Sequence, residues 1–195
     1  MIDHTGALES GPLLLGGHSM GCHTAAAWAL ANPDEVAGLI LIGPVFTGEA
    51  DGDDRWDRRA DALEQGGPEA FAEIVAENSP DEKIRETTFR LARDRARLHE
   101  HPEAVARALR EVPRSRPFGD FADLASLSVP VLVVGSHDEF DPGHPQAVAE
   151  LWAETIPGAE FEIEEAGESP LAWQGGILSR EIEAFLGRHG LAPAG

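Results

Sequence analysis

Short apolar runs alternate with helical stretches over most of the chain. The runs have the length of strands and occupy residues 13–15, 39–42 and 129–134, with an apolar-polar alternation at 161–163. The stretches that follow them have helical spacing and occupy residues 23–31, 146–156 and 176–186. Strands alternating with helices form parallel βαβ units, and unbroken apolar runs fit strands covered on both faces. The pattern therefore predicts an α/β fold with a mainly parallel sheet of about four strands.

The segment 45–118 interrupts this alternation with a purely helical pattern. It holds 13 basic and 17 acidic residues, a net charge of −4, whereas the remainder of the chain has a net charge of −16. Apolar residues recur every seven positions at Ile84, Leu91 and Leu98. Prolines divide the segment into short helices at Pro68, Pro80 and Pro102. We expect one domain of residues 1–195 with a helical insertion at 45–118.

The first apolar run leads into Gly17-His18-Ser19-Met20-Gly21, a serine between two glycines. A nucleophilic serine needs a sharp strand-to-helix turn that lifts its hydroxyl above the sheet. Side chains at either flanking glycine are expected to collide in so tight a crossing. A helix that begins just after the serine also directs its free amides at a developing oxyanion. The alternative interpretation is a serine that caps the helix in an ordinary βα turn.

Together with this motif, three further segments resemble the α/β-hydrolase superfamily. They are residues 38–44 (GLILIGP), 129–142 (VPVLVVGSHDEFDP) and 156–170 (IPGAEFEIEEAGESP). In order, they are similar to the next strand, the strand and loop of the catalytic acid, and the last strand with the histidine loop. The resemblance implies that Ser19 is the nucleophile and Asp138 the acid. It also implies that the Met20 amide is an oxyanion donor and that 45–118 is a helical cap.

Residue 168, where the resemblance implies the triad histidine, is a glutamate. The triad histidine takes the serine proton and later hands it to the leaving group. A carboxylate with a pKa near 4.3 is a poor match for that task at neutral pH. The expected site therefore has an atypical base.

Three substitutes for the base stay open. The first is a proton shared between the carboxylates of Glu168 and Asp138. A histidine of the acid loop is the second, with His144 preferred over His137. A base from a partner chain is the third. His18 is expected to support the site without reaching the serine oxygen, and His189 follows the last predicted helix, where a frayed terminus could not hold a catalytic geometry.

These residues predict a hydrolase that acts on a small ester or related acyl substrate through Ser19. The alternative is a catalytically silent relative that keeps the pocket and binds a ligand or partner. No cofactor is expected, because triad hydrolysis needs only protein groups and water. Spacing along a loop is not coordination geometry, so no metal site is expected either. The metal-capable side chains of that loop are His137, Asp138, Glu139, Asp141 and His144.

Few residues precede the first apolar run, whereas the resemblance implies further strands and helices there, including the loop that donates the second oxyanion amide. Leu13 to Leu15 would then form an apolar edge strand with unpaired backbone groups. We expect a missing N-terminal segment or a partner subunit to cover this strand.

Charge and composition narrow the remaining expectations. The formal net charge of −20 argues against nucleic acid and anionic membranes as partners, because both are bound through Lys and Arg. No run approaches the ~20 apolar residues of a membrane span, and the N-terminus lacks a basic and then apolar leader. A small-molecule substrate and a cytoplasmic location are expected. The single cysteine, Cys22, fits a reducing compartment and is expected to be buried.

Four glutamates cluster near the last predicted strand, at positions 160, 162, 164 and 165. Alternate positions on a strand point to the same face. We therefore expect Glu160, Glu162, Glu164 and Glu165 to form one solvent-facing side of an edge strand and the turn after it.

Overall fold

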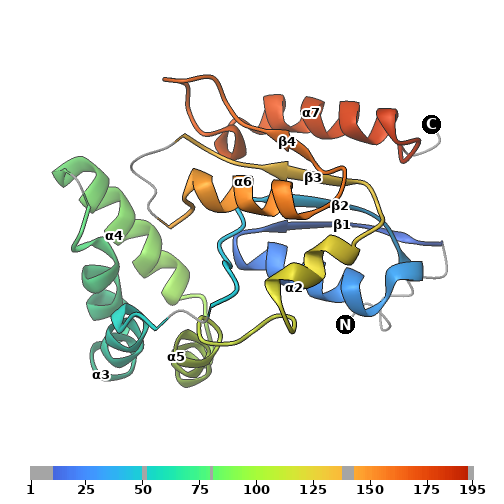
Figure 1. The fold of residues 1–195 in the computed structure, drawn as a ribbon. Helices are drawn as coiled ribbons and strands as arrows, with labels where there is room; N and C mark the ends of the chain where they lie inside the picture. Colours follow the sequence, from blue (N-terminus) through green and yellow to red (C-terminus); the bar gives the residue numbers. More distant parts are fainter. Residues whose placement is uncertain (1–10, 50–51, 80, 138–142, 193–195) are drawn as a thin grey trace. The chain divides into compact units, whose positions relative to one another are not determined.

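The segments predicted as strands form one parallel sheet with the order β1-β2-β3-β4 (Figure 1). The computed structural model describes residues 11–49, 52–79, 81–137 and 143–192. The strands are β1 (Leu13–His18), β2 (Val36–Ile42), β3 (Val131–Val134) and β4 (Glu160–Glu162). Within the described residues, the prediction of a parallel sheet of four strands in an α/β fold is confirmed.

Helices cover both faces of this sheet (Figure 1). They are α2 (Met20–Ala31), α6 (Gln146–Thr155) and α7 (Gly175–Arg188), with the short 3-10 helices η2 (Pro33–Glu35), η3 (Phe121–Ser126) and η4 (Leu171–Trp173). Leu39 and Val133 pack in the cluster formed with α2 and α6, whereas Ile40, Leu132 and Phe185 of α7 form the cluster on the other face. Successive strand residues point to opposite faces, so the unbroken apolar runs of β2 and β3 are buried on both.

The edge strand β1 is covered less completely than β2 and β3. Its residues alternate between half-buried and exposed. Leu15 packs against the cluster formed with α2, whereas Leu14 on the opposite face is 41% exposed. For β1, the expectation of an apolar run covered on both faces is therefore wrong among the described residues.

Residues 49–116 form a second compact unit, close to the predicted limits of 45–118. Its described helices are α3 (Arg55–Ala76), α4 (Glu82–Ala96) and α5 (Pro102–Glu111). The helix α3 is kinked at Gly67, where φ is 69°, directly before Pro68. Pro80 lies outside the described residues. The role of this unit as a cap stays a prediction.

Three alanines and one leucine form the buried core of the helical unit. They are Ala60, Leu63, Ala96 and Ala106. The seven-residue stripe does not join them, because Ile84 and Leu91 of α4 are 39% and 48% exposed and Leu98, which follows the end of α4, is 81% exposed. The spacing therefore predicted the helix correctly, but these side chains lie outside the core of their own unit.

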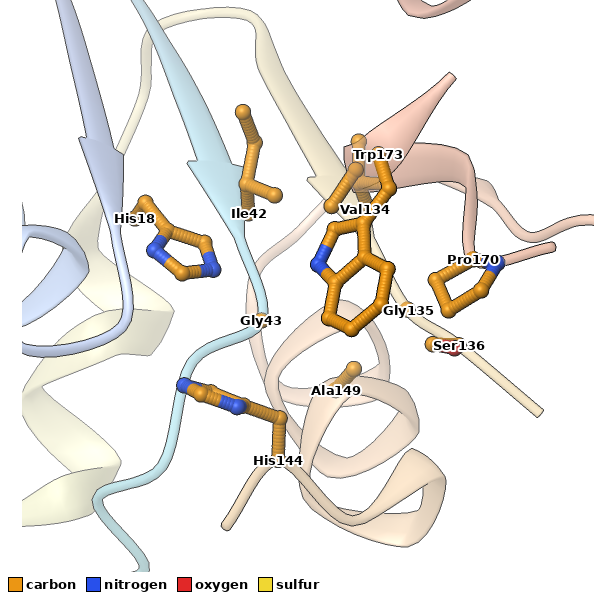
Figure 2. Close-up of a pocket in the computed structure, with 11 residues that line it drawn as sticks. His18, Ile42, Gly43, Val134, Gly135, Ser136, His144, Ala149, Pro170 and Trp173 are labelled. Atoms are coloured by element: carbon orange, nitrogen blue, oxygen red, sulfur yellow. The ribbon is translucent and has the colours of Figure 1, made fainter. Parts of the chain in front are cut away.

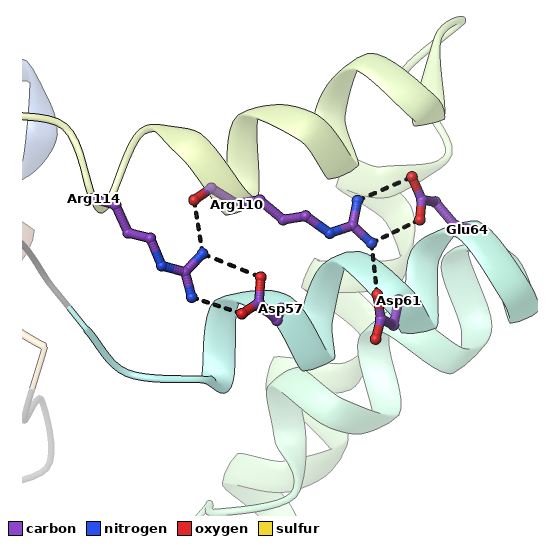
Figure 3. A network of polar contacts seen from close by, with 5 residues as sticks. All are labelled: Asp57, Asp61, Glu64, Arg110 and Arg114. Atoms are coloured by element: carbon purple, nitrogen blue, oxygen red, sulfur yellow. Dashed lines mark hydrogen bonds and ion pairs between the residues drawn. The ribbon is translucent and has the colours of Figure 1, made fainter.

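Two arginines join α5 and the residues after it to α3 (Figure 3). Arg110 donates to Asp61 (2.6 Å) and to Glu64 (2.7 Å), and Arg114 donates to Asp57 (2.7 Å). These hydrogen bonds, with that to Glu64 the largest cause, raise the pKa of Arg110. Because the pairs are exposed to solvent, they orient the two helices more than they stabilise them.

Candidate active site

The predicted nucleophile lies at a strained turn between β1 and α2. Ser19 has φ 55° and ψ −121°, and it is the only non-glycine residue with positive φ in the described part of the chain. Such a backbone costs on the order of 1–3 kcal/mol and persists where the surroundings impose it. The N–H of Ser19 donates to the carbonyl of Ile42 (2.9 Å), and the N–H of Cys22 donates to the carbonyl of Ser19 (3.0 Å). The strand, turn and helix expected around a nucleophilic serine are therefore present.

The two flanking glycines differ in what they contribute. A Cβ built on Gly17 would lie 2.2 Å from the backbone C and O of Gly21 and 2.5 Å from the N of Cys22. A Cβ built on Gly21 would meet nothing within 4 Å. The predicted collision is thus confirmed at Gly17 and wrong at Gly21, because the chain has already turned into the helix there.

Ser19 stands at the N-cap position of α2 without acting as a cap. Its side chain makes no capping hydrogen bond in this described helix. Among the described residues, the hydrogen bonds of Ser19 are those of its backbone. The hydroxyl is therefore not used to hold the helix, contrary to the capping interpretation. Met20 is the first residue of α2, where N–H groups lack intrahelical acceptors, and its role as oxyanion donor stays a prediction.

His144 lies at the same edge of the sheet as Ser19. The register pairs His18, the last residue of β1, with Ile42, the last residue of β2. The imidazole of His144 lies against that of His18, with ring centroids 5.1 Å apart and planes tilted by 32° (Figure 2). It also packs on Gly43, where a built Cβ would lie 3.2 Å from Cδ2 of His144. His144, the preferred substitute base, thus contacts Gly43. Gly43 directly follows Ile42, whose carbonyl accepts the hydrogen bond from the Ser19 N–H.

A small pocket opens at this edge (Figure 2). The imidazoles of His18 and His144 form one side, and Pro170 and Trp173 form the other. The remaining lining residues are Ile42, Gly43, Val134, Gly135, Ser136, Ala149 and Ala172. The pocket therefore combines mostly apolar walls with two titratable rings. His18 contacts the candidate base, in keeping with its predicted supporting position.

Of the two carboxylates expected near the serine, the structure describes Glu168. Glu168 lies in an exposed turn after β4, where its N–H donates to the carbonyl of Glu165 (3.0 Å), and it does not line the described pocket. Asp138 lies outside the described residues. A proton shared between Glu168 and Asp138 stays a prediction.

Two other histidines are held by neighbours of their own. Nδ1 of His137 lies 2.8 Å from Oε1 of Gln146 at the start of α6. Nε2 of His189 lies 2.7 Å from Oε1 of Glu160, the first residue of β4 and hence at the opposite end of the sheet from Ser19. His189 is therefore far from the predicted site, as expected from its place after the last helix.

A buried thiol and a half-buried imidazole at the start of α2 hold the chain around the serine. The thiol of Cys22 is fully buried and donates to the carbonyls of Gly17 and Ile42 (both 3.2 Å), and burial raises its pKa to about 12. Nε2 of His23 accepts from the N–H groups of Val45 (3.3 Å) and Phe46 (3.0 Å), and burial lowers its pKa to about 4. The sequence contained no signal for His23, because its partners are backbone amides far along the chain.

One glutamate of the acidic cluster lies in the interior. Glu164 is 5% exposed, whereas its neighbour Glu165 is exposed. The prediction of a solvent-facing side is therefore wrong for Glu164, because β4 has ended at Glu162 and the chain turns inward after it. A glutamate directly after a strand is too common a pattern to have revealed this burial.

Neither a metal centre nor a membrane span emerges from the described residues. No group of three or more His, Cys, Asp or Glu side chains among them is placed to hold a metal ion. None of the described helices is both long and apolar enough to cross a bilayer. Most of the acid loop lies outside the described residues, so its side chains are not tested as ligands.

Comparison with known proteins agrees with this fold. Residues 1–173 match the model of the alpha/beta hydrolase family. The chain therefore belongs to the alpha/beta hydrolase family. It is also 27% identical over 152 residues to RutD from Rhizobium rhizogenes, which is named for a carbamate hydrolase activity. That match covers 77% of this chain and 57% of RutD, so the chain spans little more than half of this relative.

Solved structures show the same architecture. A thermophilic esterase from Thermogutta terrifontis is 27% identical, with a TM-score of 0.71 over 96% of this chain and 68% of the esterase. MenH from S. aureus is 20% identical, with a TM-score of 0.69 over 97% of this chain and 73% of MenH. The second likeness shows the fold alone.

Proposed function

We propose that this chain is a hydrolase that cleaves a small ester or related acyl substrate, with Ser19 as nucleophile and His144 as base. The strained backbone of Ser19 carries this proposal. A φ of 55° is unfavourable for a residue with a side chain, and an ordinary βα turn does not require it. A solved relative is an esterase, and RutD is named for carbamate hydrolysis, which is a related acyl reaction.

The proposed reaction proceeds through an acyl-enzyme. Ser19 Oγ forms a bond to the substrate carbonyl carbon while its proton passes to His144. The Met20 N–H donates to the resulting oxyanion. The bond to the leaving alcohol then breaks as His144 returns the proton to it. Water attacks the acyl-enzyme in the same way and releases the acid, while Asp138 orients the base.

The position of His144 supports its assignment over the other candidates. Its ring packs on Gly43, next to the residue whose carbonyl holds the Ser19 amide. His137 is instead paired with Gln146, and Glu168 lies in an exposed turn. Of the candidate bases in the described residues, His144 is the one that lines the pocket at this edge.

Labelling with a fluorophosphonate tests the proposal. The unaltered protein should form a covalent adduct on Ser19, and Ser19→Ala should abolish it. His144→Ala should slow labelling by about 100-fold to 10,000-fold, because a general base contributes that much. Intact-mass spectrometry follows the adduct, with His101→Ala, which replaces an exposed histidine, as control. A folded protein without labelling contradicts the proposal, and a defect confined to His137→Ala transfers the role of base to His137.

A second candidate function is favoured by the glutamate at position 168, which is exposed and is not among the residues that line the described pocket. In this alternative the chain is a silent relative that binds a ligand or partner. Glu168→His then restores the side chain that the family resemblance implies. A gain of ester hydrolysis of about 100-fold or more over an inactive parent, measured with a chromogenic ester, is expected if only the base is missing. An already active parent would rule out the silent alternative.

A further inference from the structure

A buried carboxylate joins two loops beside the pocket. Glu164 is the only buried charged or polar residue among those that the structure describes, and it is 5% exposed. Burying a carboxylate is unfavourable unless hydrogen bonds compensate for the lost water. Its contacts therefore have to explain why the chain tolerates it there.

Donors from two separate segments surround this carboxylate. Oε1 accepts from the hydroxyl of Ser136 (2.8 Å) and from the N–H of His137 (2.6 Å), both in the loop after β3. Oε2 accepts from the N–H of Leu171 (3.0 Å), at the start of η4. Burial opposes ionisation of Glu164, but the hydrogen bonds, that from Leu171 foremost, outweigh it and keep its pKa below the ordinary value.

Each of these segments continues directly into the candidate site. Ser136 itself lines the pocket, and His137 immediately precedes Asp138. Leu171 stands between Pro170 and Ala172, which both line the pocket. Because one carboxylate holds both segments, it fixes the side of the pocket that Ser136 and Pro170 share, across from the two imidazoles.

We propose that Glu164 is a positioning residue, whose carboxylate bridges the loop before Asp138 and the segment at Leu171 and so holds this side of the pocket in place for the reaction at Ser19. The proposal rests on the proposed function at Ser19. A purely stabilising contact would not need a charge, since apolar residues of similar size often stabilise a core as well as buried ions do. A misplacement of reacting groups by about 1 Å slows a reaction by about 100-fold.

The variant Glu164→Gln keeps the size of the side chain and removes one acceptor. Its amide nitrogen must face either Leu171 or the donors of the loop after β3, so one side of the bridge is lost. The matched control is Glu165→Gln, the exposed neighbour. Ser136→Ala removes the hydroxyl that donates to Glu164 and so breaks one hydrogen bond of the bridge. It replaces Glu164→Gln as the test variant if Glu164→Gln does not fold.

Two kinds of readout, backbone hydrogen exchange and reactivity at Ser19, are measured on the full chain below its melting temperature. Amide hydrogen exchange at His137 or Leu171 should become at least about 10-fold faster in Glu164→Gln. The rate of fluorophosphonate labelling at Ser19 should fall by about 10-fold to 100-fold, and kcat for an ester should fall with KM little changed. Ser136→Ala should shift both readouts in the same direction by less, and Glu165→Gln should shift neither.

An unchanged labelling rate in Glu164→Gln overturns the positioning role, whatever happens to its melting temperature. If Ser19 of the unaltered protein is not labelled at all, the proposed function fails separately. Amide hydrogen exchange then still tests whether Glu164 bridges the two segments. Unchanged exchange at both His137 and Leu171 in Glu164→Gln would contradict the bridge.

Discussion

Gly17→Ala is expected to destabilise the protein by at least about 3 kcal/mol and to lower its melting temperature by about 10 °C or more. The new Cβ would lie 2.2 Å from the backbone C and O of Gly21. Neither backbone atom can move without distorting the start of α2, and Cys22 behind it is fully buried. Thermal unfolding followed by circular dichroism measures the effect.

Gly21→Ala is the matched control for this prediction. The two glycines flank the same serine, yet a Cβ at Gly21 meets nothing within 4 Å. Alanine also favours a helix by roughly 0.5–1 kcal/mol over glycine, so Gly21→Ala should be neutral or slightly stabilising. Equal destabilisation by both substitutions would show that the turn differs from the one described.

The second large effect is a loss of stability in acid that depends on His23. Burial lowers the pKa of His23 from 6.5 to about 4. Between these values the unfolded chain binds a proton that the folded chain does not, so stability falls as the pH falls. The contribution is complete above pH 6.5 and decreases through pH 4. It amounts to about 3 kcal/mol, at 1.36 kcal/mol for each pKa unit.

Urea unfolding at a series of pH values measures this contribution. The difference in unfolding free energy between pH 7 and pH 4 should be about 3 kcal/mol smaller in His23→Gln, because glutamine keeps an acceptor but does not titrate. His101→Gln, in which an exposed histidine is replaced, should retain the full difference. Parallel profiles for the unaltered protein and His23→Gln would contradict a half-buried His23 whose pKa is lowered.

Much of the fold follows from local pattern. The apolar runs at β2 and β3 predicted strands buried on both faces, and periodicity predicted α2, α6 and α7. The structure extends β1 to His18 and begins α2 at Met20, directly after the serine. Element ends are set by hydrogen bonds between segments, such as that from Ser19 to Ile42, which a local pattern does not contain.

The candidate site was only partly predictable. The pentapeptide predicted the strand-turn-helix at Ser19 and the need for glycine at Gly17. The symmetry of the pentapeptide also predicted that glycine is required at Gly21, but a Cβ built there would meet no other atom within 4 Å. His23 and Glu164 were missed because their partners lie far from them in sequence or belong to the backbone.

By itself, the sequence determined the α/β class, the order of the elements and the residue at the turn, because periodicity and glycine placement are local properties of a chain. Only the tertiary structure decided which histidine stands beside the turn, that Glu164 is buried, and which of two glycines is sterically required. Those properties depend on contacts between segments that the sheet brings together, such as Gly43 with His144 and Glu164 with His137. Linear spacing contains no information about such contacts.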